Sequence, residues 1–512
     1  MDGLSLMITF AREIWNNEDK VFARGMLIAF IACILFYIGL IVFAIGDGRY
    51  GFIHDDEFNY VAAAKLFSET YAVRAPLCMM EEVSKILGAN WYGFSYNIFY
   101  GVFYIIFGEH SILFILINAL FLILCLALIL KSFATSYNKI FAMLMLLLSY
   151  PVMVYTFMFF PEILHIFLAL IQFMLLYKIY QIYLSKGNYG QPVFMFVVLS
   201  LVFSLFRVTS VFWIAGIIPF YKNPKQFINR IVVFIASVVL VMVYMHYFIA
   251  PAFVYPMSSI ESLKRFQLDT FFKMWIKYAG YNFNTLVSFT IKEPQVFILM
   301  FLFLYAVLKS FYKKEKLFLS AVLICLCYFF ALISFYNVVP FYFSKQTAVL
   351  YPLLIGALTF SSSLSVRKFA ILCMLVAFPF NFKSATLEII KRKNSGVELE
   401  TKYANQVSEL KKISQLVDQD KRNLIEFIHY EYKFPRYIFY EALPLSNKNK
   451  YPITYTASLY NESLYPDMDY NDRFVRYKRL KVNYVLSRDS LNIEKLEMIY
   501  HSPYYNLYKD NR

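Results

Sequence analysis

The sequence predicts an all-α polytopic membrane protein that carries a small α/β domain at its C-terminus. Hydrophobic residues make up 60% of the 512 residues, and charged residues only 16%. Apolar runs of about 18 to 25 residues, the length that a helix needs to cross a bilayer, recur along most of the chain. From about residue 383 the apolar runs shorten and charges of both signs become frequent, which is typical of a soluble domain.

The pattern divides the chain into a transmembrane module over 1–382 and a soluble domain over 383–512, with the N-terminus in the cytoplasm. Lys and Arg gather in alternate short loops, and loops of this kind face the cytoplasm. The long first loop, 47–110, and the C-terminal domain are then extracytoplasmic. About eleven spans are expected, at roughly 26–46, 111–130, 139–158, 161–183, 192–206, 208–221, 229–250, 295–312, 317–338, 345–361 and 367–382.

Three further segments have the aromatic, amphipathic character of helices that lie in the membrane interface. Two, at about 58–70 and 93–107, are in the first loop, and the second of them is alternatively an ordinary span. The third lies within the 251–293 loop. In the C-terminal domain, apolar spacing predicts a helix over 400–420 and strands at 482–487 and 504–508.

Composition excludes several classes of site. The net charge of +15 lies largely in the short loops, where it orients the chain and meets anionic lipids, so it does not indicate a nucleic-acid partner. Five of the six cysteines lie in apolar spans and Cys78 is alone in a loop, which is neither a disulfide framework nor a zinc pattern. No cofactor is expected.

The most informative stretch is acidic and directly follows the first span. Asp55, Asp56 and Glu57 stand at the edge of the bilayer, where a carboxylate is costly and usually has a function. A helical run over 61–67 follows, so the three carboxylates would occupy a helix N-terminus, where the dipole favours negative charge. A carboxylate placed there can act as a general base. The alternative is a solvated loop that only ends the span.

Other ionisable residues stand at span ends on the same predicted side. Arg207 interrupts an apolar run, Lys345 follows an aromatic stretch, and Glu162 follows Pro161. Alternatively, Arg207 and Lys345 only extend toward the lipid headgroups and Glu162 only caps its helix. His165 is expected to be a histidine of the apolar core. Together the positions predict an extracytoplasmic site in which cations hold a lipid phosphate while a carboxylate activates an acceptor, as in sugar transfer from a lipid-linked donor.

The chain resembles the GT-C superfamily of integral membrane glycosyltransferases, in the branch of the protein O-mannosyltransferases and the lipid A aminoarabinose transferases. The resemblance covers about residues 25–360. Its motifs are Asp56-Glu57-x-x-Tyr60 followed by Ala62-Ala63-Ala64, Gly93-Phe94-Ser95-Tyr96-Asn97 through Phe107-Gly108, Pro161-Glu162, the Arg207 stretch, and Lys345 with Tyr351-Pro352. Two features depart from the pattern: Asp55 adds an acid before the usual pair, and Lys345 lacks an adjacent Tyr.

The resemblance implies that residues 1–382 form a catalytic module that transfers a sugar with inversion. Asp56 would be the base, with Asp55 as the alternative, and Glu57 and Tyr60 would support it or bind the acceptor. Arg207 and Lys345 would contact the polyprenyl phosphate, and Glu162 would be a further acid of the site. The departure at Asp55 also leaves open a divalent cation at Asp55 and Glu57.

The expected donor is an undecaprenyl-phosphate hexose in a bacterial inner membrane. The expected acceptor is an envelope glycan such as O-antigen in lipopolysaccharide, as for the phage-type O-antigen glucosyltransferases, with lipid A and protein as alternatives. Two other functions fit many spans with buried charges: a transporter or flippase for lipid-linked glycans, and a polymerase or ligase of surface polysaccharide. A purely structural membrane protein is the last alternative.

Overall fold

The computed structural model describes residues 20–46, 48–53, 55–74, 76–79, 95–110, 112–133, 135–248, 267–292, 316–335, 345, 347–361, 364–428, 442–458, 482–487, 490–491 and 495–511. Contacts divide the chain into two compact units. Unit 1 comprises Met1–Gly46, Phe114–Val241 and Phe253–Ile389, and unit 2 comprises Asp47–Leu113, Met242–Ala252 and Ile390–Arg512. The domain boundary predicted between residues 382 and 383 stays a prediction; the helix α17 (Leu364–Glu400) is continuous across it.

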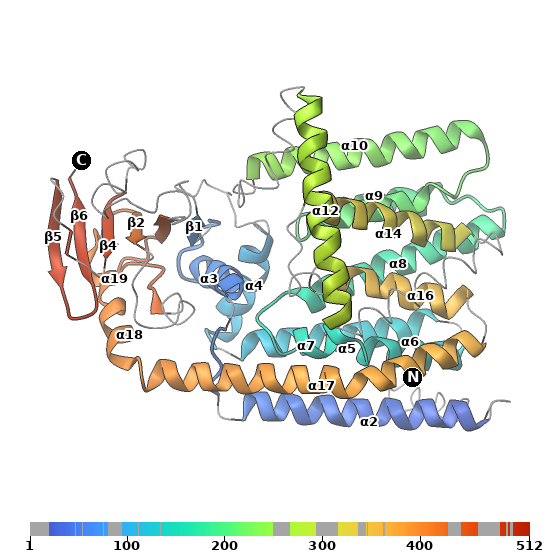
Figure 1. The fold of residues 1–512 in the computed structure, drawn as a ribbon, viewed down its shortest axis with the longest axis horizontal. Helices are drawn as coiled ribbons and strands as arrows, with labels where there is room; N and C mark the ends of the chain where they lie inside the picture. The colour runs from blue at the N-terminus through green and yellow to red at the C-terminus, as the bar shows by residue number, and fades with distance from the viewer. Residues whose placement is uncertain are drawn as a thin grey trace. The chain divides into compact units, whose positions relative to one another are not determined.

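Unit 1 is helical, as the apolar runs predict (Figure 1). Among the described residues, five helices are long and apolar enough to cross a membrane, namely α2, α5, α8, α10 and α17. The count of about eleven spans is not confirmed, and the span expected at 295–312 lies outside the described residues. The helices wholly or mostly in unit 1 are α2 (Lys20–Ile45), α5 (Leu113–Ser132), α6 (Ser136–Leu147), α7 (Tyr150–Tyr155), α8 (Glu162–Leu184), α9 (Gly190–Ser204), η1 (Val208–Ile217), α10 (Pro224–Phe248), α12 (Leu268–Lys292), α14 (Lys316–Phe335), η2 (Ala348–Leu350), α16 (Tyr351–Ser361) and α17.

Two runs that were predicted as single spans do not form one membrane-spanning α-helix. The run 139–158 forms α6 and then the short α7, because Pro151 cannot donate a backbone hydrogen bond and would clash with the carbonyl four residues earlier. The run 208–221 forms the ten-residue 3₁₀-helix η1. At about 2 Å rise per residue, η1 extends about 20 Å and cannot cross a core of about 30 Å on its own.

The hairpin of α9 and η1 determines where Arg207 lies in unit 1. Helix α9 has 15 residues and extends about 22 Å, close to the 20 Å of η1. The two elements pack against each other, so the chain returns to the end at which α9 began. Tyr189 before α9 and Gln226 after η1 are joined there by a hydrogen bond of 3.2 Å. Arg207 therefore lies at the opposite, far end of the hairpin.

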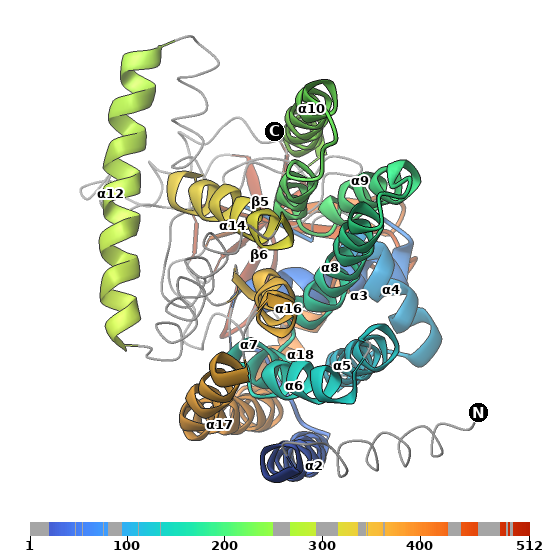
Figure 2. The ribbon, with the colours of Figure 1, turned by 90° about the vertical axis from the view of Figure 1, so that its right-hand side faces the viewer.

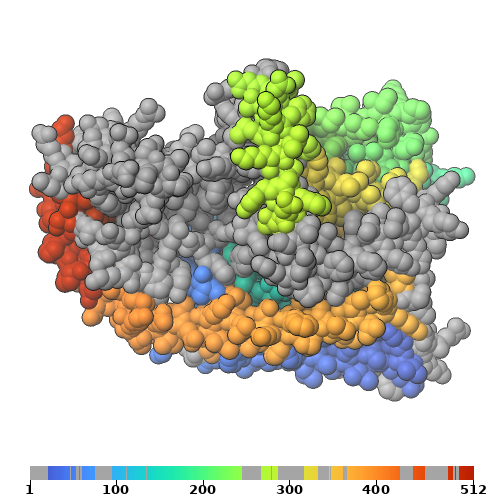
Figure 3. All heavy atoms as spheres, in the orientation of Figure 1, coloured from blue at the N-terminus to red at the C-terminus, as the bar shows by residue number. Residues whose placement is uncertain are grey.

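Helix α12 lies across the direction of the other unit 1 helices. Figures 1 and 2 show α8, α9, α10 and α14 aligned with one another, with α12 at a steep angle to them. It is a raised ridge in Figure 3, and its side chains Phe272, Ile276 and Tyr281 are exposed. The helix expected within 251–293 is thus present; its placement in the membrane interface stays a prediction.

Unit 2 combines two helices of the first loop with a sheet formed mainly by the C-terminal region. Helices α3 (Asp55–Thr70) and α4 (Ser95–Phe107) pack against each other, in agreement with the helices expected at 58–70 and 93–107. Helices α18 (Ala404–Lys411) and α19 (Ile413–Leu416) cover the expected helical stretch at 400–420. The strands are β1 (Leu77–Met79), β2 (Asn423–Ile428), β3 (Ile453–Ser458), β4 (Tyr484–Ser487), β5 (Leu496–His501) and β6 (Asn506–Asp510).

The six strands form one sheet in the order β1-β3-β2-β4-β6-β5. The first four are parallel and the last two pairings are antiparallel. Strand β1 comes from the first loop and pairs with β3, with Leu77 opposite Tyr455. Because strands of one sheet lie on one side of a membrane, the first loop and the C-terminal region share a side; which side stays a prediction.

Candidate functional site

A buried asparagine fixes the corner at which α8 begins. The side-chain amide of Asn118 on α5 donates to the backbone carbonyls of Tyr155 at 3.1 Å and Met158 at 2.9 Å, with that of Phe160 at 3.4 Å. These carbonyls lie at the end of α7 and in the turn that follows it, where a helix end leaves carbonyls that need donors. The corner thereby places Glu162 in the first turn of α8, where the helix dipole favours its charge.

Arg207 is the centre of a buried polar cluster in unit 1. It stands between α9 and η1 with an extended backbone, at φ −143° and ψ 108°. Its Nη1 donates to Oε1 of Glu162 at 3.2 Å and lies 2.8 Å from Nδ1 of His165. Its Nη2 donates to the backbone carbonyl of Lys345 at 3.0 Å, although the two residues are 138 positions apart. The Arg207 cluster, defined as Glu162, His165, Arg207 and Lys345, is buried throughout.

The contacts of the Arg207 cluster indicate the tautomer of His165 and the environment of Lys345. A guanidinium only donates, so Nδ1 of His165 accepts from Arg207 and the proton of a neutral ring is on Nε2. The Nζ of Lys345 lies 4.3 Å from the ring centroid of Phe160, a cation–π contact. The four side chains thus comprise two basic groups, Arg207 and Lys345, one carboxylate, Glu162, and one imidazole, His165.

The acidic stretch belongs to unit 2 and opens α3. Asp55 and Asp56 are the first two residues of this helix, as predicted, so they stand where the helix dipole favours negative charge. Their side chains lie outside the described part of the chain. Tyr60, one turn further, is buried, and its ring meets that of Tyr96 on α4 edge-on, with the ring centroids 5.1 Å apart.

Glu57 is held in a buried ion pair. Its Oε1 lies 2.6 Å from Nη1 of Arg392, and both side chains are 0% exposed. Its Oε2 accepts the backbone N–H of Ile53 at 3.1 Å. The Arg392 guanidinium also lies over the ring of Tyr50, 5.9 Å from its centroid. Arg392 of α17 therefore anchors the beginning of α3 to the end of α17.

Two glycines allow this anchoring. A Cβ on Gly396 would lie 2.9 Å from the backbone nitrogen of Tyr50, and one on Gly51 would lie 2.8 Å from the nitrogen of Gly396. Both distances are shorter than real Cβ contacts, so the two backbones meet only because neither residue has a side chain. Ser395 fastens the contact by donating from Oγ to the carbonyl of Phe52 at 2.8 Å.

The structure brings together three of the predicted site residues, Glu162, Arg207 and Lys345, within unit 1. Asp55, Asp56, Glu57 and Tyr60 share one helix in unit 2, and a common site formed from both groups stays a prediction. Sequence reasoning gave no role to His165, Asn118 or Arg392. The i, i+3 spacing of Glu162 and His165 is a signal for the first, since such residues share a helix face. A lone Asn in an apolar helix is a signal for the second.

Comparison with known proteins gives a structural likeness. No protein-family model and no curated protein matches the chain. The crystal structure of ArnT from Cupriavidus metallidurans in the apo state aligns over 95% of this chain and 98% of that chain, with 12% sequence identity and a TM-score of 0.47. The structure of ArnT from the same organism bound to undecaprenyl phosphate aligns over 94% and 98%, with 12% identity and a TM-score of 0.42. Likenesses at this level assign neither a family nor an activity to this chain.

Proposed function

We propose that the protein is an inverting membrane glycosyltransferase that moves a hexose from a polyprenyl-phosphate donor to an envelope-glycan acceptor on the extracytoplasmic side. One observation carries the proposal: two basic residues far apart in the sequence, Arg207 and Lys345, are joined by a hydrogen bond in a buried cluster in which Arg207 also contacts Glu162. A departing lipid phosphate is an anion that forms at the edge of a low-dielectric medium. A preorganised cationic cluster stabilises charge of this kind as it develops.

The proposed reaction is a single displacement at the anomeric carbon. A hydroxyl of the acceptor glycan attacks this carbon while a carboxylate, Asp56 or alternatively Asp55, takes the hydroxyl proton. The bond from the anomeric carbon to the phosphate oxygen breaks, and the polyprenyl phosphate leaves with the electron pair. Arg207 and Lys345 stabilise the negative charge that collects on the phosphate oxygens.

Glu57 and Glu162 are proposed to position other groups. Both oxygens of Glu57 have partners, Arg392 and the Ile53 N–H, so this residue is suited to fixing the start of α3 rather than to taking a proton. A divalent cation at Asp55 and Glu57 would have to displace Arg392. Glu162 holds one nitrogen of Arg207 and so orients its guanidinium. Tyr60, which lies in the first turns of α3, is proposed to contact the acceptor.

The test is transfer of radiolabelled hexose from a polyprenyl-phosphate sugar into envelope fractions by membranes that contain the full chain. Asp56→Asn should lower transfer by about 10²- to 10⁴-fold, the usual contribution of general base catalysis, while the protein level stays unchanged. Asp55→Asn identifies which of the two acids is the base. Asp269→Asn, in the first turn of α12, removes a carboxylate elsewhere and should leave transfer unchanged.

Normal transfer by both the Asp56→Asn and the Asp55→Asn variants would show that neither is the base. The absence of any transfer by the unaltered chain, together with movement of labelled lipid-linked glycan between the two leaflets, would favour a flippase. In that case the Arg207 cluster would bind the same phosphate during transport, and replacing Asp56 should cause only a mild loss.

A further inference from the structure

A cavity of about 440 Å³ lies in unit 1 at the far end of α8 and α9 from the Arg207 cluster. Glu162 opens α8 and the loop that follows Leu184 lines the cavity, so the two sites lie toward opposite ends of α8. The path along α9 is shorter, because this helix begins in the cavity lining and extends about 22 Å toward Arg207. The cavity and the Arg207 cluster are therefore toward opposite ends of the hairpin of α9 and η1, and the basic loops predict that the cavity faces the cytoplasm.

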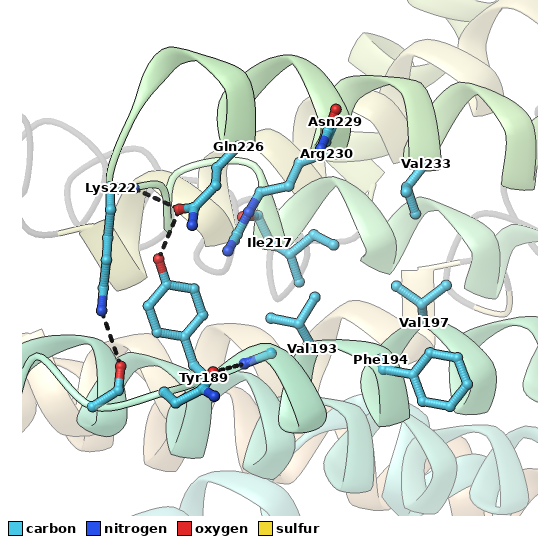
Figure 4. A pocket seen from close by; sticks show the side chains of 13 residues that line it. Tyr189, Val193, Phe194, Val197, Ile217, Lys222, Gln226, Asn229, Arg230 and Val233 are labelled. Carbon is cyan, nitrogen blue, oxygen red and sulfur yellow. Dashed lines mark hydrogen bonds between the residues drawn. The ribbon is translucent and has the colours of Figure 1, made fainter.

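One end of the cavity is polar and cationic (Figure 4). The ring of Tyr189 lies between two cations: Lys222 Nζ and Arg230 Cζ are each 5.2 Å from its centroid. Lys222 Nζ donates to the backbone carbonyls of Lys186 at 3.3 Å and Gly187 at 3.1 Å, which leaves its charge unneutralised. No residue that lines the described cavity is acidic, so this end is suited to an anion.

The other end of the cavity is apolar. Figure 4 shows Val197, Phe194 and Val233 at the end away from Lys222. Phe194 is 66% exposed although it stands on an apolar helix, and the outward faces of α9 and α10 continue this apolar surface. A soluble anion would leave this half of the cavity unused. The combination of a cationic end with an apolar wall that opens toward the bilayer fits a lipid that has a phosphate headgroup.

We propose that this cavity binds an acidic glycerophospholipid of the cytoplasmic leaflet. The phosphate binds at the cationic end of the cavity, beside Lys222, Tyr189 and Arg230, and an acyl chain follows Val197 and Val233 along the groove between α9 and α10. The bound lipid fills the groove between α9 and α10, and its binding does not depend on the sugar-transfer reaction.

The test is native mass spectrometry of the full chain in detergent, titrated with phosphatidylglycerol and, separately, with phosphatidylcholine of the same acyl chains. We expect tighter retention of phosphatidylglycerol. Lys222→Gln should weaken it about fivefold, since a cation near an anionic lipid surface contributes about 1 kcal/mol. The matched control is Lys225→Gln, which removes the same charge from an exposed residue that does not line the cavity. Equal retention of both lipids, or equal effects of the two substitutions, would overturn the proposal.

A second pair of variants tests the apolar half of the cavity with substitutions that leave every charge in place. Val233→Trp should fill the groove and lower retention of phosphatidylglycerol, while Val232→Trp, the neighbouring exposed position outside the cavity, should not. Glycerol 3-phosphate added in excess should not compete with the lipid. Competition by this soluble anion would show that the cavity takes a free phosphate and not a lipid. Full retention of phosphatidylglycerol by the Val233→Trp variant would show that no acyl chain lies in this groove.

Discussion

The buried pair of Glu57 and Arg392 gives the sharpest prediction about how the acidic stretch is held. Arg392→Met keeps most of the side-chain volume and removes the charge, so that the carboxylate of Glu57 stays buried, 0% exposed, without the cation that lies 2.6 Å away. Breaking a buried ion pair from one side costs about 3 to 5 kcal/mol because the remaining charge is uncompensated. In a unit of this size that corresponds to a fall of about 6 to 20 °C in the unfolding midpoint.

The assay is the apparent thermal midpoint of the detergent-solubilised full chain, measured at one fixed heating rate. The double variant Glu57→Gln with Arg392→Met removes both charges, and we expect it to lie closer to the unaltered protein than Arg392→Met alone. The matched control is Arg49→Met. Arg49 pairs with Glu400 at 3.0 Å in the same unit, but the two side chains are 48% and 55% exposed, so the loss should be below about 1 kcal/mol.

Two outcomes would refute this reasoning. If Arg392→Met and Arg49→Met shift the midpoint by the same small amount, the Glu57 carboxylate is solvated and does not depend on Arg392. If the double variant is as unstable as the sum of the two single variants, the two side chains do not interact. In either case the anchoring of α3 to α17 would rest on the glycine contact and on the hydrogen bond from Ser395 to the Phe52 carbonyl.

Three further predictions follow from named contacts. In the Arg207→Lys variant the planar guanidinium that donates to both Glu162 and the Lys345 carbonyl is lost, so transfer should fall about 10- to 100-fold. An unchanged kcat/KM would contradict this. Asn118→Leu removes the donors of the corner before α8 and should cost about 1 to 3 kcal/mol, with an unshifted midpoint as the contrary result. Hydrogen bonds from Lys412 and Tyr500 lower the pKa of Glu409, so its stabilising effect is present above its ordinary pKa and is lost as the pH falls through the lowered value. Glu409→Gln should therefore make the midpoint less sensitive to acid, and identical acid titrations of the two proteins would exclude this role.

Local signals predicted the helical character of the chain and part of the site. An arginine inside an apolar run is costly, and the Arg207 stretch was therefore predictable as a functional position. Its proximity to Lys345 was expected from a shared role at the lipid phosphate, not as a direct contact between the two residues. The actual contact passes through the backbone carbonyl of Lys345, and no side-chain pattern encodes a backbone acceptor.

The parts that were not predicted depend on contacts between distant segments or on backbone chemistry. Hydropathy averages over a window, so it extended one span through Pro151, although α6 ends at Leu147 and a new helix, α7, begins at Tyr150. Arg392 was not predicted because its partner, Glu57, lies in another region of the chain and nothing local marks the pairing. For the same reason the short β1 was read as part of a loop, since its hydrogen-bonding partner is the remote β3.

The pairing of β1 with β3 has a consequence for how the protein is made. Leu77–Met79 cannot find Ile453–Ser458 until the ribosome has passed the latter, roughly 20 to 75 seconds later at about 5 to 20 residues per second. Throughout that interval the nascent first loop has an open strand edge. The sheet can therefore close only after synthesis has passed Ser458, late in the making of the chain.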